Sequence, residues 1–180
     1  KNPPEGIVKG SFLDWDNMLF ACINCNSSKG NTPITAELFF LPEVHNTHLA
    51  FEYRVIDHPF KLGQKACVPI PSQFPMADTA KASRTIALLK LDDLKNDKGE
   101  EQDLRWHFRH QTLLVAQQWK KEWDTFGYLQ ANAFIPLMLT AATAKGFFSI
   151  WMQVFSDVPQ VCLALIDAFP GTAKDCFDPK

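Results

Sequence analysis

The residues of this chain that are best suited to chemistry lie together between Asp14 and Asn31. An Asp-Trp-Asp-Asn turn leads into a short apolar run and then into two cysteines, Cys22 and Cys25, with two residues between them. Two thiolates at this spacing can bind one tetrahedral metal ion, and zinc is the usual occupant. Because a structural zinc ion takes four ligands, this pair supplies half of a site.

A lone CxxC pair also has two simpler interpretations, a redox pair and ordinary buried cysteines. The redox interpretation is disfavoured because no βαβ pattern surrounds the pair. The remaining cysteines, Cys67, Cys162 and Cys176, are scattered along the chain. An odd total of five cysteines argues against a disulfide framework and favours a reducing compartment.

The neighbours of the two cysteines form a more specific pattern. From Asn17 to Gly30 the chain reads Asn-Met-Leu-Phe-Ala-Cys-Ile-Asn-Cys-Asn-Ser-Ser-Lys-Gly. This order resembles the C-terminal half of the ββα-metal motif of HNH endonucleases, which often reads N-L-x-x-x-C-x-x-C-N-x-x-K-G. The resemblance implies metal-dependent hydrolysis of phosphodiester bonds, with Mg²⁺ or Mn²⁺ as the catalytic cation and Zn²⁺ as a structural ion.

The same resemblance implies a role for each matching residue. Asn26 would ligate the catalytic Mg²⁺ through its amide oxygen, and Asn17 would brace the loop that carries the catalytic histidine. Cys22 and Cys25 would be two of the four zinc ligands, and Lys29 would contact nucleic-acid phosphate. Without the resemblance, Asn17 is an ordinary turn residue, Asn26 a helix-capping residue and Lys29 a solvated charge.

The motif is incomplete in this chain. Its general base is a histidine that precedes the asparagine, whereas residues 1–16 contain no histidine. The resemblance therefore places the base and a second CxxC pair upstream of Lys1, and we expect the chain as given to lack catalytic competence.

The histidines of the chain all follow the cysteines. The sequence Asp57-His58-Pro59 has the wrong order for the missing base and is interpreted as a loop. We expect His45 and His48 to be exposed in a proline-flanked loop, and His107 and His110 to lie on the surface of a helix.

Later segments are similar to HNH nucleases of the Septu and retron-associated defence type. The matches are Leu49–Glu52, Arg84–Asp92 with the later Leu94 and Arg105, and Gly146–Ser149. They imply a role in bacterial anti-phage defence in the cytoplasm. Nucleic acid, DNA before RNA, would be the substrate, and an SMC-like or ABC-type ATPase would be the controlling partner. The alternative is a non-catalytic zinc-finger and helical module that docks a partner ATPase or nucleic acid.

The elements that must position these residues divide the chain into three parts. Residues 1–35 would form the C-terminal half of the ββα-metal finger, with a helix beginning within Cys22–Lys29. Residues 36–80 would be a loop-rich connection with a strand at Leu49–Val55, and residues 81–180 a helical body. Good capping residues for the first helix are Asn24, Asn26, Ser27 and Ser28. Further helices are expected at 79–95, 103–124, 128–143, 146–155 and 159–168. The predicted fold class is α+β, mainly α, with a small ββα-metal finger packed on a helical C-terminal body.

Composition narrows the functional classes. The chain has 180 residues, of which 46% are hydrophobic and 21% charged, as in an ordinary globular protein. Its net charge of −2 means that any nucleic-acid surface must be a local patch. Polar residues interrupt the apolar stretch 134–155, so it is interpreted as buried helix and not as a membrane span. We expect most of six aromatic residues to lie in the core and a few at an interface: Trp106, Trp119, Trp123, Phe147, Phe148 and Trp151.

Overall fold

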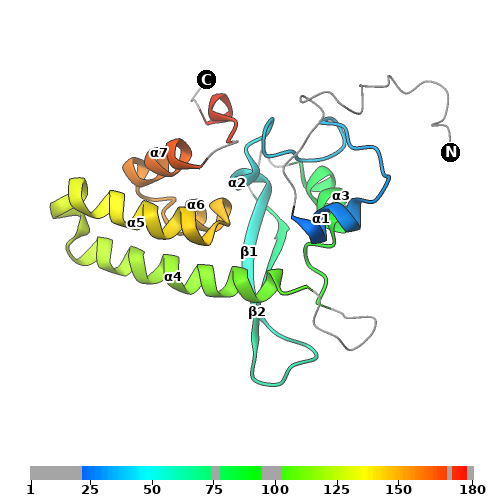
Figure 1. Ribbon diagram of the computed structural model, residues 1–180, viewed down its shortest axis with the longest axis horizontal. Coiled ribbons are helices and arrows are strands. Elements are labelled where there is room, and N and C mark those ends of the chain that lie inside the picture. Colours follow the sequence, from blue (N-terminus) through cyan, green and yellow to red (C-terminus); the bar gives the residue numbers. More distant parts are fainter. Residues whose placement is uncertain (1–21, 74–77, 95–102, 170–171, 178–180) are drawn as a thin grey trace.

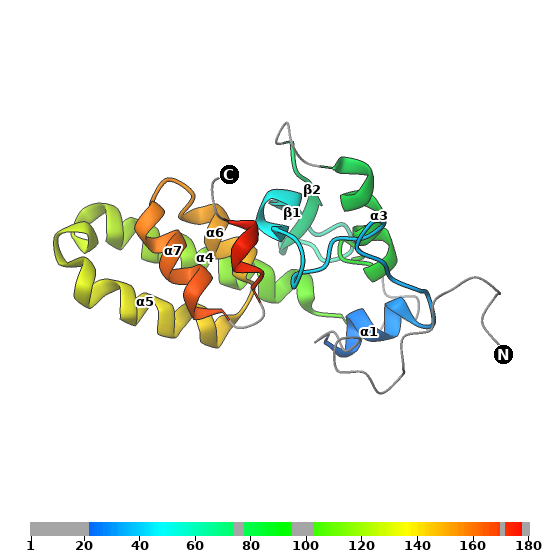
Figure 2. The same cartoon turned by 90° about the horizontal axis from the view of Figure 1, so that it is seen from above.

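The computed structural model describes residues 22–73, 78–94, 103–169 and 172–177. A long helix, α4 (Arg105–Thr125), runs along the molecule. A helical bundle lies at one end of it, and the short helix α1 (Ile23–Lys29) lies at the other end with α3 (Thr79–Leu89) (Figures 1 and 2). The described part is mainly helical with one small sheet, in agreement with the predicted class. The part of the predicted ββα-metal finger that precedes α1, residues 1–21, lies outside the described residues.

The bundle forms around the second half of α4. A 3₁₀ turn, η2 (Gly127–Gln130), reverses the chain so that α5 (Ala131–Lys145) runs back beside α4. The short helices α6 (Phe148–Val154) and α7 (Pro159–Ala168) complete the bundle. The buried apolar side chains of this core are Ala116, Trp123, Phe134, Met138, Ala142, Trp151, Met152, Phe155, Val158, Val161, Leu165 and Ile166.

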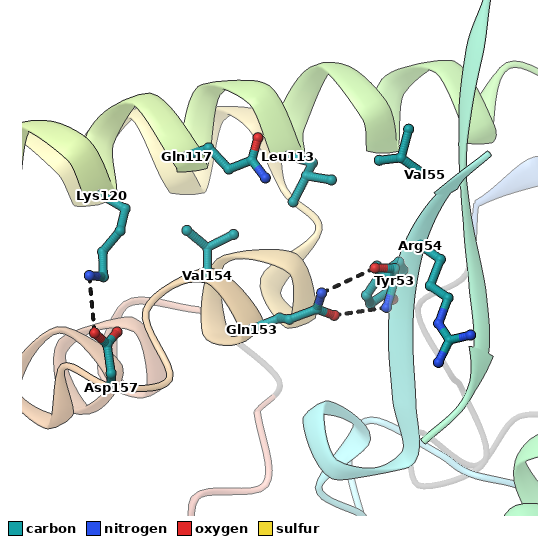
Figure 3. A pocket seen from close by; sticks show the side chains of 9 residues that line it. All are labelled: Tyr53, Arg54, Val55, Leu113, Gln117, Lys120, Gln153, Val154 and Asp157. Atoms are coloured by element: carbon teal, nitrogen blue, oxygen red, sulfur yellow. Dashed lines mark hydrogen bonds and ion pairs between the residues drawn. The ribbon is translucent and has the colours of Figure 1, made fainter. Parts of the chain in front are cut away.

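A β-hairpin lies beside the first half of α4. Strands β1 (Phe51–Asp57) and β2 (Lys65–Pro71) are antiparallel, with Tyr53 opposite Pro69. The Gln153 side chain on α6 binds both the backbone N–H and the carbonyl of Tyr53, which therefore point away from β2 (Figure 3). Pro69, its cross-strand partner, then also faces away from β1, so its missing N–H removes no bond from the ladder.

A second, smaller core joins the hairpin to α3 and to α2 (Thr47–Ala50). Its buried residues are Ala50, Phe51, Ala82 and Ile86. Lys81 is buried at the edge of this core, where its ammonium donates to the Ala36 carbonyl and contacts His45 Nε2. A buried cation needs such partners, because burial without them is strongly unfavourable.

Several predicted elements need correction. The helix expected at 79–95 ends at Leu89, because Lys90 adopts a left-handed conformation with φ of 49°. The strand expected at Leu49–Val55 is shifted by two residues, and its partner β2 lies where a proline-rich loop was expected. The helix expected at 146–155 begins at Phe148, since Gly146 ends α5 with φ of 73°.

The apolar stretch 134–155 is divided between α5 and α6 and contributes to the bundle core. Across the described ranges, no helix is long and apolar enough to span a bilayer. Trp106, Trp123 and Trp151 are buried, as expected for core residues. None of the six aromatic residues considered for an interface is exposed. Among the described residues, the exposed large aromatic side chains are Phe60, Phe108, Phe126 and Tyr128.

Candidate functional site

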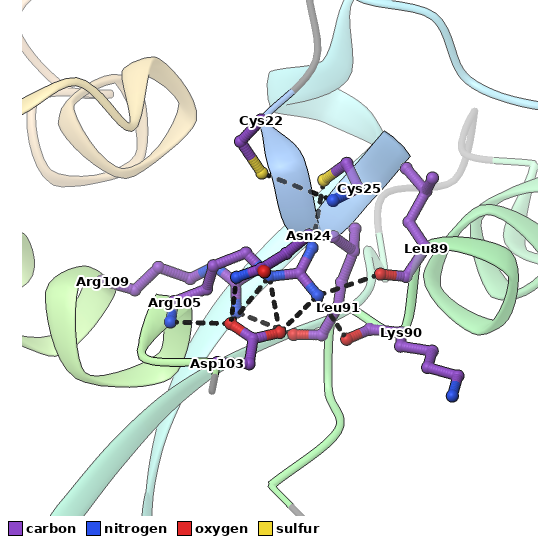
Figure 4. Close-up of polar contacts among 9 residues, drawn as sticks. All are labelled: Cys22, Asn24, Cys25, Leu89, Lys90, Leu91, Asp103, Arg105 and Arg109. Atoms are coloured by element: carbon purple, nitrogen blue, oxygen red, sulfur yellow. Dashed lines mark hydrogen bonds and ion pairs between the residues drawn. The ribbon is translucent and has the colours of Figure 1, made fainter. Parts of the chain in front are cut away.

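The cysteine pair forms a knuckle at the start of α1. Cys22 is the N-cap residue, with an extended backbone, and its Sγ accepts a hydrogen bond from the Cys25 N–H at 3.4 Å (Figure 4). The Asn26 N–H donates to the Cys22 carbonyl at 3.0 Å and closes the first turn. The cap is therefore a cysteine sulfur, and the prediction of an asparagine or serine cap is wrong.

The other predicted site residues on α1 remain accessible. Asn26 is exposed, and within the described residues its side chain makes no hydrogen bond. Among the described residues, the Lys29 ammonium donates only to the Gly30 carbonyl, at 3.5 Å. Gly30 ends the helix with φ of 53°, a conformation that favours glycine. Asn17, predicted to brace the histidine loop, lies outside the described residues.

An arginine from the far end of the sequence contacts the knuckle. Arg105, in the first turn of α4, donates from Nη1 to the Cys25 Sγ at 3.0 Å. Its Nη2 donates to the carbonyls of Leu89 and Lys90, each at 3.1 Å. Nε and Nη2 also bind the Asp103 carboxylate, with a closest approach of 2.6 Å (Figure 4). One guanidinium thus joins the knuckle, the end of α3 and the start of α4.

Asp103 joins Arg105, Asn24 and the two cysteines in one polar cluster. Its Oδ1 accepts from the Asn24 side chain at 3.2 Å and from the Arg105 backbone N–H at 3.0 Å. One turn further along α4, the buried Arg109 donates to the Leu91 carbonyl at 2.7 Å. The two arginines therefore bind the carbonyls of the last residue of α3 and of the two residues that follow it, where the chain leaves the helix and intrahelical partners are missing.

The charges of the cluster act on the two thiols in different ways. For Cys22, burial raises the pKa, but hydrogen bonding with Cys25 and the positive charge of Arg105 outweigh burial, so the pKa lies below its usual value. For Cys25, burial and the contact with Cys22 raise the pKa despite Arg105. Burial also raises the Asp103 pKa, but the bonds from Arg105 outweigh this and hold that pKa low. Asp103 and Arg105 therefore form a charged pair beside the thiols.

The knuckle suits half of a zinc site. The N–H···S bond to Cys22 and the Arg105 bond to Cys25 are contacts that stabilise sulfur ligands in their deprotonated form. Cys22 and Cys25 would supply two of four ligands. In the part of the chain that the structure describes, no group of three or more His, Cys, Asp or Glu residues is placed to hold a metal ion.

The histidines occupy other places. His58 follows β1 and is buried, with its ring 4.4 Å from the Trp106 ring between centroids and its Nδ1 accepting from the Phe60 N–H. His45 and His48 are half-buried, so the prediction that they are exposed is wrong. His45 Nδ1 accepts from the Leu41 N–H, which fixes the turn before α2.

Sequence reasoning identified the cysteines but not the residues that hold them. Arg105 was noted only as part of a family-like helix, and neither Asp103 nor the side chain of Asn24 was assigned a role in the site. The single local signal is the Asp-x-Arg sequence at the start of α4, where Asp103 accepts from the Arg105 backbone. Comparison with protein-family models, with curated proteins and with solved structures finds no match to this chain.

Proposed function

We propose that this chain is part of a metal-dependent HNH endonuclease subunit that hydrolyses nucleic acid, with DNA as the expected substrate. The observation that carries the proposal is the geometry of α1. Cys22 caps the helix and bonds through sulfur to the Cys25 N–H, and Asn26 follows with an exposed amide. A zinc-supported helix start with an oxygen donor beside it is what the resemblance requires of this segment.

The residues of α1 have separate tasks in this proposal. A divalent cation at the site would neutralise charge on the scissile phosphate and stabilise the leaving oxygen. Asn26 would offer its amide oxygen, a hard donor suited to Mg²⁺ or Mn²⁺. Lys29 lies three residues further, on the same side of the helix, and its ammonium suits a sequence-independent contact with the nucleic-acid backbone. Cys22 and Cys25 would hold the structural zinc ion.

The biological setting follows from the shorter resemblances. Arg84–Leu89 lies in α3, and Ser149 is buried at the start of α6, so these matching segments belong to elements around the site and the bundle. They support a bacterial defence nuclease that acts in the cytoplasm under the control of an SMC-like or ABC-type ATPase.

The test is the Asn26→Ala variant of the intact protein, assayed for Mg²⁺-dependent cleavage of plasmid DNA. Cleavage should be abolished, while zinc content and circular dichroism remain unchanged. Ser27→Ala is the matched control, because Ser27 is the next residue on α1 and is equally exposed. Ser27→Ala should cleave at the native rate.

Three results would count against parts of the proposal. Cleavage at the native rate by Asn26→Ala would show that Asn26 is not a ligand of the catalytic cation. A folded intact protein without zinc would show that the cysteines are not zinc ligands. Zinc binding without any cleavage in Mg²⁺ or Mn²⁺ would favour the non-catalytic module that docks an ATPase or nucleic acid.

A further inference from the structure

Within the part of the chain that the structure describes, helix α1 does not belong to an apolar core. None of its residues is buried, and Ile23, its first residue, has 83% of its surface exposed. A seven-residue helix is too short to be stable by itself in water. Polar contacts with the rest of the protein must therefore hold the knuckle in place.

Those contacts converge on one side chain. Arg105 uses all three guanidinium nitrogens, and the acceptors come from the knuckle, from the end of α3 and from Asp103. The Arg105 side chain is only 11% exposed, so its bonds are largely shielded from water. The planar fork of a guanidinium can serve several acceptors at fixed angles, whereas a lysine ammonium is a single point charge.

The contacts of Asp103 reinforce those of Arg105. Asp103 binds Arg105 through both carboxylate oxygens, and its Oδ1 also accepts from the Asn24 side chain on α1. The carboxylate thus fixes the guanidinium and at the same time holds the residue next to Cys25. Asn24 and Cys25 are thus each held by a residue at or just before the start of α4.

We propose that Arg105, oriented by Asp103, is a positioning residue that fixes the CxxC knuckle to the ends of α3 and α4. It sets the position and the hydrogen bonding of the Cys25 sulfur, so that both sulfurs are presented to one thiophilic metal ion. The metal-binding part rests on the proposed function, whereas the attachment of α1 is a statement about the fold alone.

The attachment is tested by hydrogen exchange of the full-length, metal-free protein. In Arg105→Gln, amide exchange in residues 22–30 and 86–91 should accelerate roughly tenfold or more, because the charged bonds that hold both segments are lost. Exchange in α7 should stay unchanged and serves as the internal reference. Arg84→Gln is the matched control, since Arg84 also donates to a distant carbonyl, that of Leu38, but makes no hydrogen bond with the knuckle among the described residues.

The effect on the sulfurs is measured with zinc and cobalt. Loss of an outer hydrogen-bond partner weakens metal binding by about 10–100-fold, which a competing chelator can measure for Zn²⁺ in Arg105→Gln. In the Co²⁺-loaded variant, the sulfur-to-cobalt charge-transfer band should move to lower energy, because Cys25 has lost a donor. A residue that only stabilises the fold would leave this band in place. Arg105→Lys should recover part of the zinc affinity.

The outcomes separate the two proposals. Unchanged α1 exchange in Arg105→Gln and in Arg105→Lys would overturn the attachment. If Arg105→Gln does not fold, the same exchange measurement on Arg105→Lys and Asn24→Ala decides whether these contacts attach α1. A native protein that binds neither Zn²⁺ nor Co²⁺ would overturn the metal-binding part and the structural zinc site of the proposed function, while exchange would still decide whether Arg105 holds α1.

Discussion

Replacing Gln153 by leucine should lower the free energy of unfolding by about 2 kcal/mol. The Gln153 side chain binds the outer edge of β1 twice, accepting from the Tyr53 N–H at 2.8 Å and donating to the Tyr53 carbonyl at 3.1 Å (Figure 3). Each such bond contributes roughly 1 kcal/mol net. The adjoining groove, of about 690 Å³, includes Leu113 and Val154, so leucine keeps apolar neighbours. In the variant, water in the groove can bind the Tyr53 N–H and carbonyl in place of Gln153. The loss of unfolding free energy should therefore not exceed about 2 kcal/mol.

Urea denaturation followed by tryptophan fluorescence measures the effect. The matched control is Gln117→Leu, because Gln117 lines the same groove but its side chain makes no hydrogen bond with another described residue. For a chain of this size, a loss of about 2 kcal/mol corresponds to a melting temperature about 4–8 °C lower. If Gln153→Leu unfolds within roughly 0.5 kcal/mol of the control, the usual range for surface substitutions, the two bonds do not anchor β1.

Other predictions concern the bundle and the histidines. In Gly127→Ala the new Cβ would lie 3.0 Å from the Phe134 ring, so stability should fall by about 1–3 kcal/mol; an unchanged urea midpoint would show that the ring moves freely. Leu165→Ala should lose about 2–5 kcal/mol, because Leu165 is fully buried, whereas Leu163→Ala, at 64% exposure on the same helix, should lose far less. Stability should also fall from pH 7 to pH 5. Burial lowers the pKa of four histidines, His45, His48, His58 and His110. Below about pH 6.5 the unfolded chain then binds more protons than the native one, and urea midpoints that stay level across this range would contradict the reasoning.

Local sequence signals predicted the elements that depend on local structure. Helix α7 begins and ends at the predicted residues, and its start is explained by Pro159, which can occupy the first turn without loss of a hydrogen bond. Helix α4 was predicted within two residues at either end, although Phe108 and Leu114, two members of the apolar stripe that predicted it, are exposed. The cysteine pair was correctly expected at a helix start.

Contacts between segments that are distant in the sequence could not be predicted from local sequence signals. Strand β2 carries Pro69 and Pro71, which indicate a loop unless the register is known, and the register depends on β1. Arg105 lies 80 residues from Cys25, and nothing in either local sequence indicates that they meet. Half-buried His45 similarly contacts Lys81 of α3, which lies 36 residues away in the sequence.

The two ends of the molecule are held by different forces, and this affects how the candidate site can respond to a ligand. The bundle is stabilised by a continuous apolar core, whereas α1 buries no side chain and depends on the contacts of Arg105 and Asp103. Segments with few buried apolar contacts open at a lower free energy than the core. A metal ion that binds both sulfurs only in the native arrangement adds its binding free energy to that arrangement. Zinc should therefore slow amide exchange in α1 strongly and in α7 little, and equal protection of both helices would mean that α1 is not the less stable part.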